Sequence, residues 1–115
     1  MIDLHTHTTA SDGTDSPAEL VNKALSAGIQ TLAITDHDST SGWAEAIATL
    51  RPPMSLVLGA EISTLTLEGI SVHILGLLFD GKDSDLQAML ADSRDTRIPR
   101  MRKMVELMAA DGIAI

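Results

Sequence analysis

The sequence predicts an α/β fold in which the first strands are parallel. Short apolar segments alternate with amphipathic helical segments through residues 2–63, the β-α-β-α-β order typical of parallel sheets with right-handed crossovers. Histidine or carboxylate residues stand near the end of each apolar segment, as happens where parallel strands bring polar side chains to one edge. The chain has 115 residues and is 44% hydrophobic, which is enough for one packed domain.

The first strand and the first helix have clear boundary signals. Ile2–His7 is short and is bounded by Ser, Asp and Gly, so we expect a strand there. Ser16 then caps a helix, Pro17 suits its first position, and Glu19 completes a capping box. Gly28 is the expected end of this helix.

Two further strands enclose a second helix. Thr31–Thr35 is apolar enough to be buried on both faces of a sheet, and SLVLGAEIS (residues 55–63) is the third expected strand. Between them we expect a helix over roughly residues 42–50, ended by Arg51-Pro52-Pro53.

The pattern changes after residue 63. TLTLEGISVHILGL (residues 64–77) alternates around Glu68-Gly69, which predicts a hairpin. A helix is expected over roughly residues 84–110, with Pro99 as the place where it breaks or kinks and Gly112 as its stop. Its expected core positions are Leu86, Leu90, Ile98, Met101, Val105 and Met108.

Residues 112–115 resemble the first residues of another strand. Three parallel strands and a hairpin do not close a barrel. We therefore expect residues 1–115 to be the N-terminal portion of a longer domain.

The composition disfavours several classes of function. With 16 acidic and 8 basic side chains the formal net charge is -8, which argues against an extended nucleic-acid or anionic membrane surface. Cysteine is absent, so disulfides and thiolate metal sites are excluded. The sequence has no apolar run of membrane-spanning length and no visible signal peptide, so a cytoplasmic location is expected. Nothing in the sequence indicates the oligomeric state.

Candidate ligands stand near the carboxyl ends of the three expected strands. His5 and His7 are two residues apart, so on a strand their imidazoles point to the same side. Asp36 and His37 end the second strand, and Glu61 lies near the end of the third. Because the carboxyl ends of adjacent parallel strands form one edge, these side chains are expected to meet. The pattern predicts a metal site rather than unrelated polar residues.

Four other residues carry alternative interpretations. Asp12 is either a turn or cap residue or a ligand that folds back over the edge. His73 is either a satisfied core histidine or a ligand, because its pleat position is opposite to those of its aliphatic neighbours. Asp36 is expected to orient a ligand rather than to bind metal directly. Asp38 is expected to be solvated or to cap a helix.

The number of candidate ligands exceeds what one tetrahedral ion needs, which predicts two or three divalent ions. Nitrogen and oxygen ligands without sulfur suit Mn, Zn or Fe. Clustered ions of this kind activate water at neutral pH and stabilise displacement at phosphorus. The candidates are His5, His7, Asp12, His37, Glu61 and His73.

Two arginines are candidates for substrate binding. Arg94 and Arg97 are three residues apart and are neighbours on a helix. A guanidinium can bind phosphate through two hydrogen bonds, although a solvated helix face is the alternative.

The segments DLHTHTTASDG, AITDHDS, GAEIS and VHILGL together resemble the PHP (polymerase and histidinol phosphatase) family, and most of all its small metal-dependent phosphoesterases. The resemblance covers essentially the whole chain. It implies a distorted (β/α)7, TIM-like barrel with a trinuclear metal site, of which this chain is the N-terminal part. The family completes that site with a later histidine and a C-terminal Asp-x-His, and no histidine follows His73 here.

The resemblance also implies a role for each candidate. His5 and His7 would bind the first ion, and Glu61 would bridge the first and second ions. The remaining implied roles are His73 on the second ion, Asp12 and His37 on the third, and Arg94 and Arg97 near the substrate phosphate.

The expected function is hydrolysis of small phosphate esters, with nucleotides as the expected substrates, by metal-activated water. Two alternatives stay open. One is an amidohydrolase-like enzyme that cleaves C–N bonds, because a histidine pair on a first barrel strand is also found there. The other is a metal-binding structural or interaction module without activity, of the polymerase-associated PHP type.

Overall fold

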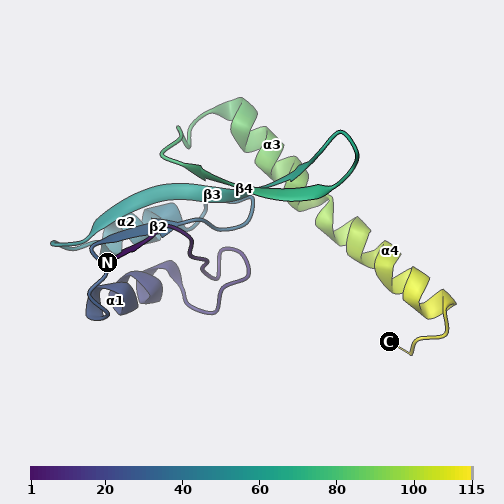
Figure 1. Ribbon diagram of the computed structural model, residues 1–115, viewed down its shortest axis with the longest axis horizontal. Helices are drawn as coiled ribbons and strands as arrows, with labels where there is room; N and C mark the ends of the chain where they lie inside the picture. The colour runs from purple at the N-terminus through teal and green to yellow at the C-terminus, as the bar shows by residue number, and fades with distance from the viewer. Residues whose placement is uncertain (115) are drawn as a thin grey trace.

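The computed structural model describes residues 1–114 and has a curled four-stranded sheet with helices beside it (Figure 1). The strand order is β1-β2-β3-β4, formed by Ile2–Asp3, Thr31–Ile34, Ser55–Leu65 and Ser71–Leu77. The first three strands are parallel, and β4 is antiparallel to β3. The predicted α/β class with parallel first strands is confirmed, and the curled sheet has the shape of part of a TIM-like barrel.

The first two helices cover the sheet and build the core. Helix α1 (Pro17–Ser26) begins with the predicted capping box, since Ser16 Oγ accepts from the Glu19 N–H and the Glu19 carboxylate accepts from the Ser16 N–H. Helix α2 is Trp43–Thr49. The buried core cluster comprises Val21, Ala24, Leu32, Ile34, Ala46 and Met54. Strand β2 is buried from Leu32 through Ile34, as predicted for a strand covered on both faces.

The strand boundaries differ from the prediction at two places. Strand β1 ends at Asp3, so the segment that carries His5 and His7 lies beyond the ladder. Contacts with a segment distant in the sequence replace the ladder there, since Thr6 exchanges hydrogen bonds with the backbone and the hydroxyl of Thr35. The predicted third strand and the first arm of the hairpin are one continuous strand, β3, which turns at residues 66–70 into β4.

The predicted long helix is divided in two. Helix α3 is Ser84–Asp95 and helix α4 is Arg97–Ala110, with the break at Thr96. Pro99 accounts for the break, because proline lacks the N–H that would bond to the Asp95 carbonyl and its ring crowds that group. Gly112 ends α4 with a φ of 83°, as predicted. Ile113 and Ala114 form no strand, and Ile115 lies outside the described residues.

A broad apolar surface is exposed on the later elements. Helix α4 extends away from the sheet (Figure 1), and the molecule measures 54 × 33 × 22 Å. Leu90 in α3 is buried as predicted, but the expected core positions of α4 are exposed, so that part of the core prediction is wrong for this chain. Large exposed side chains include Ile98, Met101, Val105 and Met108 on α4 and Val72, Ile74, Leu75 and Leu77 on β4. Within residues 1–114, no helix combines the length and the apolar character that crossing a membrane requires.

A surface of this kind favours association. We expect residues 1–115, expressed alone, to bind the dye ANS and to self-associate as concentration rises. The double substitution of Met101 and Met108 by Lys should reduce both effects, because these two side chains are exposed and lie two helical turns apart on α4. Dye fluorescence and light scattering measure the two effects. A monodisperse monomer without dye binding would contradict the expectation.

Candidate metal centre

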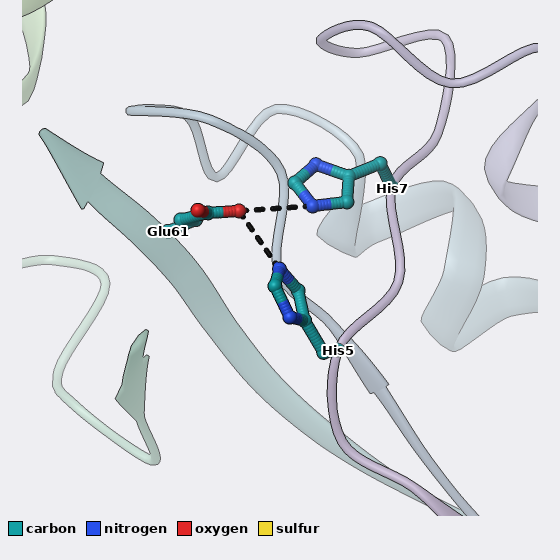
Figure 2. A group of neighbouring side chains, drawn as sticks. All are labelled: His5, His7 and Glu61. Carbon is teal, nitrogen blue, oxygen red and sulfur yellow. Dashed lines mark hydrogen bonds and ion pairs between the residues drawn. The ribbon is translucent and has the colours of Figure 1, made fainter. Parts of the chain in front are cut away.

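Two histidines next to β1 point at one carboxylate oxygen. His5 Nε2 lies 2.8 Å and His7 Nε2 lies 2.9 Å from Glu61 Oε2 (Figure 2). Both imidazoles therefore point to the same side, as their spacing predicted, although the two residues lie beyond the β1–β2 ladder. Asp3 supports this segment, since its carboxylate accepts from the His5 N–H at 3.2 Å.

The backbone places His37 opposite Glu61. After β2 the chain continues beside β3, where an isolated parallel bridge pairs His37 with Glu61. The Glu61 N–H donates to the Asp36 carbonyl, and the Asp38 N–H donates to the Glu61 carbonyl, both at 3.0 Å. His37 Nε2 lies 3.8 Å from Glu61 Oε2. Glu61 lies in the middle of β3 rather than near its end, because β3 continues into the hairpin.

His73 and Asp12 complete the group. His73 Nδ1 lies 2.9 Å from Glu61 Oε1, the carboxylate oxygen that His5 and His7 do not contact, so the core interpretation of His73 is wrong. The Asp12 carboxylate is 66% exposed, and its two oxygens lie 3.3 Å from His7 Nδ1 and 3.3 Å from His37 Nε2. Asp12 therefore folds back over the edge and is more than a turn residue.

A glycine allows this return of the loop. Gly13 donates its N–H to the Thr8 carbonyl at 2.9 Å. A Cβ atom at Gly13 would lie 2.4 Å from the His7 carbonyl oxygen, which no real side chain tolerates. The close approach of Gly13 to His7 is what brings Asp12 over the imidazoles.

The six side chains form three overlapping groups, and in each group the ligand atoms lie within 4.8 Å of one another. The groups are His5, His7 and Glu61; His7, Asp12 and His37; and His37, Glu61 and His73. Their nitrogen and oxygen donors suit divalent ions. His7 Nδ1 and His37 Nδ1 are buried without a hydrogen-bond partner, which is uncommon for polar atoms in proteins. The 3.3 Å approach of His7 Nδ1 to Asp12 has ion-pair distance but not hydrogen-bond geometry. The donor set fits metal ions.

The charge of Glu61 is stabilised where it is buried. Burial acts to raise the pKa of this carboxyl group, since its side chain is only 11% exposed. Hydrogen bonds from His5 and His73, with the charges of His37 and His5, outweigh burial and hold the pKa of Glu61 below its usual value. Glu61 is therefore ionised at neutral pH.

Asp36 supports the loop that follows His7. Its buried carboxylate accepts from the Thr8 N–H at 2.7 Å, the Thr8 hydroxyl at 2.8 Å and the Ser11 hydroxyl at 2.7 Å. The structure gives it no hydrogen bond or ion pair to an imidazole among the described residues. Asp36 thus fixes the backbone between His7 and Asp12, and its contribution to catalysis stays a prediction.

Asp38 was expected to be solvated or to cap a helix, and this expectation is wrong. Its side chain is fully buried and accepts from the Ser63 N–H and hydroxyl, each at 2.7 Å. Arg97 Nη2 donates to the same carboxylate at 2.6 Å, and Arg94 Nη1 donates to the Asp38 carbonyl at 2.5 Å. This Asp38 network ties the α3–α4 break to the loop that carries His37.

The Asp38 network could have been suspected from the arginines. Neither Arg94 nor Arg97 has an acidic residue three or four positions away on its helix, so neither can form an ion pair of that kind within its helix. The structure supplies a partner in Asp38. Their predicted proximity to a substrate phosphate stays a prediction.

Replacing Asp38 with Asn should destabilise the fold by about 2–4 kcal/mol, because an amide cannot satisfy every donor around it and Arg97 loses its counter-charge. Asp95→Asn is the matched control, since the Asp95 carboxylate is exposed and makes no hydrogen bond or ion pair among the described residues. Urea unfolding measures both variants. Equal stability of the two variants would show that the network contributes nothing.

The parallel strand edge, with histidines and a shared buried carboxylate, defines a candidate metal-dependent hydrolase site. Residues 3–108 match the model of the PHP domain, so the chain belongs to the PHP domain family. The resemblance inferred from the sequence motifs is confirmed.

Three proteins illustrate the relationship. A 5'-3' exoribonuclease of Haemophilus influenzae is 41% identical over 112 residues, which cover 96% of this chain and 40% of that protein. A 3',5'-nucleoside bisphosphate phosphatase of Chromobacterium violaceum is 40% identical over 114 residues, 98% of this chain and 40% of that protein. The structure of a protein described as a metal-dependent phosphoesterase, from Bifidobacterium adolescentis, superimposes with a TM-score of 0.84 at 39% identity and covers 96% of this chain and 38% of that one. The chain thus spans about two fifths of the length of these relatives.

Proposed function

We propose that this chain belongs to a metal-dependent phosphoesterase that hydrolyses small phosphorylated molecules, with nucleotides as its substrates. The observation that carries the proposal is the convergence of four histidines and Asp12 around the buried Glu61 carboxylate. The names of the relatives support it, since they include a nucleoside bisphosphate phosphatase and a protein described as a metal-dependent phosphoesterase.

The ligand assignment is part of the proposal. His5, His7 and Glu61 would hold one ion, and His73 with the other oxygen of Glu61 would hold a second. Asp12 and His37 would hold a third. Each group leaves positions open for water, for substrate or for ligands from further residues. Mn, Zn and Fe all suit this donor set.

Bound divalent ions would supply Lewis acidity, which lowers the pKa of water and stabilises negative charge on phosphoryl oxygens. The residues of this chain orient and neutralise the site. Ionised Glu61 places a negative charge between the histidines. Asp36 and Asp38 accept hydrogen bonds that hold the two loops carrying His7 and His37. No serine or cysteine nucleophile is needed.

We further propose that residues 1–115 are the N-terminal portion of a PHP domain. The length of the relatives supports this, as do the exposed apolar side chains of β4 and α4. The remaining portion would supply further ligands and cover that surface.

The proposed function predicts metal-stimulated phosphate release. The protein that contains this chain, stripped of metal, should hydrolyse nucleoside mono- or bisphosphates only after Mn or Zn is added. Glu61→Gln should lower kcat/KM by more than about 100-fold, beyond the loss typical of residues that only support a ligand. Glu106→Gln is the matched control, because Glu106 is exposed on α4 and lies far along the sequence from all six candidate metal ligands. Phosphate release colorimetry measures both variants.

The same assay separates the alternatives. Absence of metal-stimulated phosphate release from every nucleotide would contradict the proposal. Amide hydrolysis without phosphate release would instead favour the C–N hydrolase. Metal bound in stoichiometric amounts, measured by plasma mass spectrometry, with no turnover of either kind would favour the inactive metal-binding module.

A further inference from the structure

Thr8 is the anchor of the loop that carries Asp12. The Thr8 carbonyl accepts from the Ser11 N–H at 3.0 Å and from the Gly13 N–H at 2.9 Å. These two donors stand on either side of Asp12 in the sequence, so the carbonyl closes the loop around it. The Thr8 hydroxyl also accepts from the Ala10 N–H at 3.1 Å, and Thr8 itself is fully buried. The position of Asp12 therefore depends on the position of Thr8.

The Asp36 carboxylate fixes this anchor. It accepts from both the N–H and the hydroxyl of Thr8, and from the hydroxyl of Ser11. Among the described residues, these three contacts are all the hydrogen bonds that join residues 8–13 to a distant segment of the chain. Hydrogen bonds to an ionised acceptor are stronger than those to a neutral one. The loop is thus held to the sheet mainly by one carboxylate.

The four candidate histidine ligands have supports that do not use this carboxylate. The segment with the first two histidines is attached through Thr6, which exchanges hydrogen bonds with Thr35. The backbone on either side of His37 bonds to the backbone of Glu61, and His73 lies in the β3–β4 ladder. Within residues 1–114, the ligand on the loop is therefore the one whose support comes mainly from the Asp36 side chain.

We propose that Asp36 is a positioning residue for a single ion, the one assigned to Asp12 and His37, and that it acts on this ion through Asp12. The inference rests on the ligand assignment of the proposed function and goes beyond it, because it makes the three sites unequal. Asp12 is 66% exposed and approaches His37 Nε2 at 3.3 Å, whereas Glu61 is buried. The ion at Asp12 is accordingly the most weakly bound of the three and the first to be lost when the loop loosens.

The test counts the Mn²⁺ ions on the protein that contains this chain, by native mass spectrometry of the metal-free protein over a range of Mn²⁺ concentrations. Asp36→Asn replaces an acceptor oxygen with an NH₂ donor, so the three donors that face it cannot all be satisfied. We expect the affinity for one ion to fall by about tenfold or more, as is typical when a residue that orients a ligand is removed. The other two ions should keep their wild-type affinity.

A double-substitution cycle shows whether Asp36 acts through Asp12. Asp12→Asn removes the ligand itself and should weaken the same ion. The combined variant should bind that ion no more weakly than Asp12→Asn alone, because loop position no longer matters once the ligand is lost.

Two further variants separate positioning from stability. Ser11→Ala removes one of the three hydrogen bonds to Asp36 and should weaken the same ion by a smaller factor, so it carries the test even if Asp36→Asn does not fold. Val21→Ala is the control, because Val21 is fully buried in a core cluster that contains no residue of the loop. It should lower stability in urea unfolding and leave all three affinities unchanged.

The outcomes for the loop and for the proposed function are distinct. Equal weakening of every ion by Asp36→Asn, unchanged affinities in both Asp36→Asn and Ser11→Ala, or a wild-type protein that binds fewer than three ions would overturn the proposal. Phosphate release with any of these results would leave the proposed function standing. Selective weakening of one ion in a protein that releases no phosphate would support the role of Asp36 and refute the proposed function.

Discussion

The buried carboxylate of Glu61 is the constraint on which the rest of the structure depends. Burying a carboxylate is costly unless hydrogen bonds and opposite charge compensate for it. The compensation comes from His5 and His7 after β1, from His37 after β2 and from His73 on β4. Elements distant in the sequence must therefore meet at one point, and the parallel order of β1, β2 and β3 with the hairpin brings them there. The same convergence that compensates Glu61 creates the candidate donor set for metal.

Two further carboxylates fix the loops around this point. Asp36 and Asp38 flank His37, and both are buried with their oxygens satisfied by hydrogen bonds from other segments. The Asp36 carboxylate accepts hydrogen bonds from the loop that leads from His7 to Asp12. Asp38 accepts hydrogen bonds from β3 and from the arginines of the α3–α4 break. His37 is thereby held between two rigid attachments, which suits a ligand whose direction matters. Arg94 and Arg97 are positioned by the same contacts.

Local signals in the sequence predicted much of this arrangement. The features that they did not predict depend on tertiary contacts. The capping box at Ser16 and the spacing of His5 and His7 each involve residues only a few positions apart, so both can be recognised directly in the sequence. The burial of Asp38 depends on Ser63 and Arg97, which lie 25 and 59 residues away, and no local pattern encodes such a pairing. Strand β1 ends early because Thr6 bonds to Thr35, another distant contact. The exposed methionines of α4 had a helical pattern that indicates an apolar face but not what packs against it.

Anomalous X-ray diffraction from crystals of the protein grown with manganese tests the central claim most directly. We expect anomalous peaks within bonding distance of His5, His7 and Glu61 and of His73 and Glu61, with a further peak near Asp12 and His37. Their absence at saturating manganese, or peaks only at surface carboxylates such as Glu106, would contradict the claim that these side chains form a metal centre.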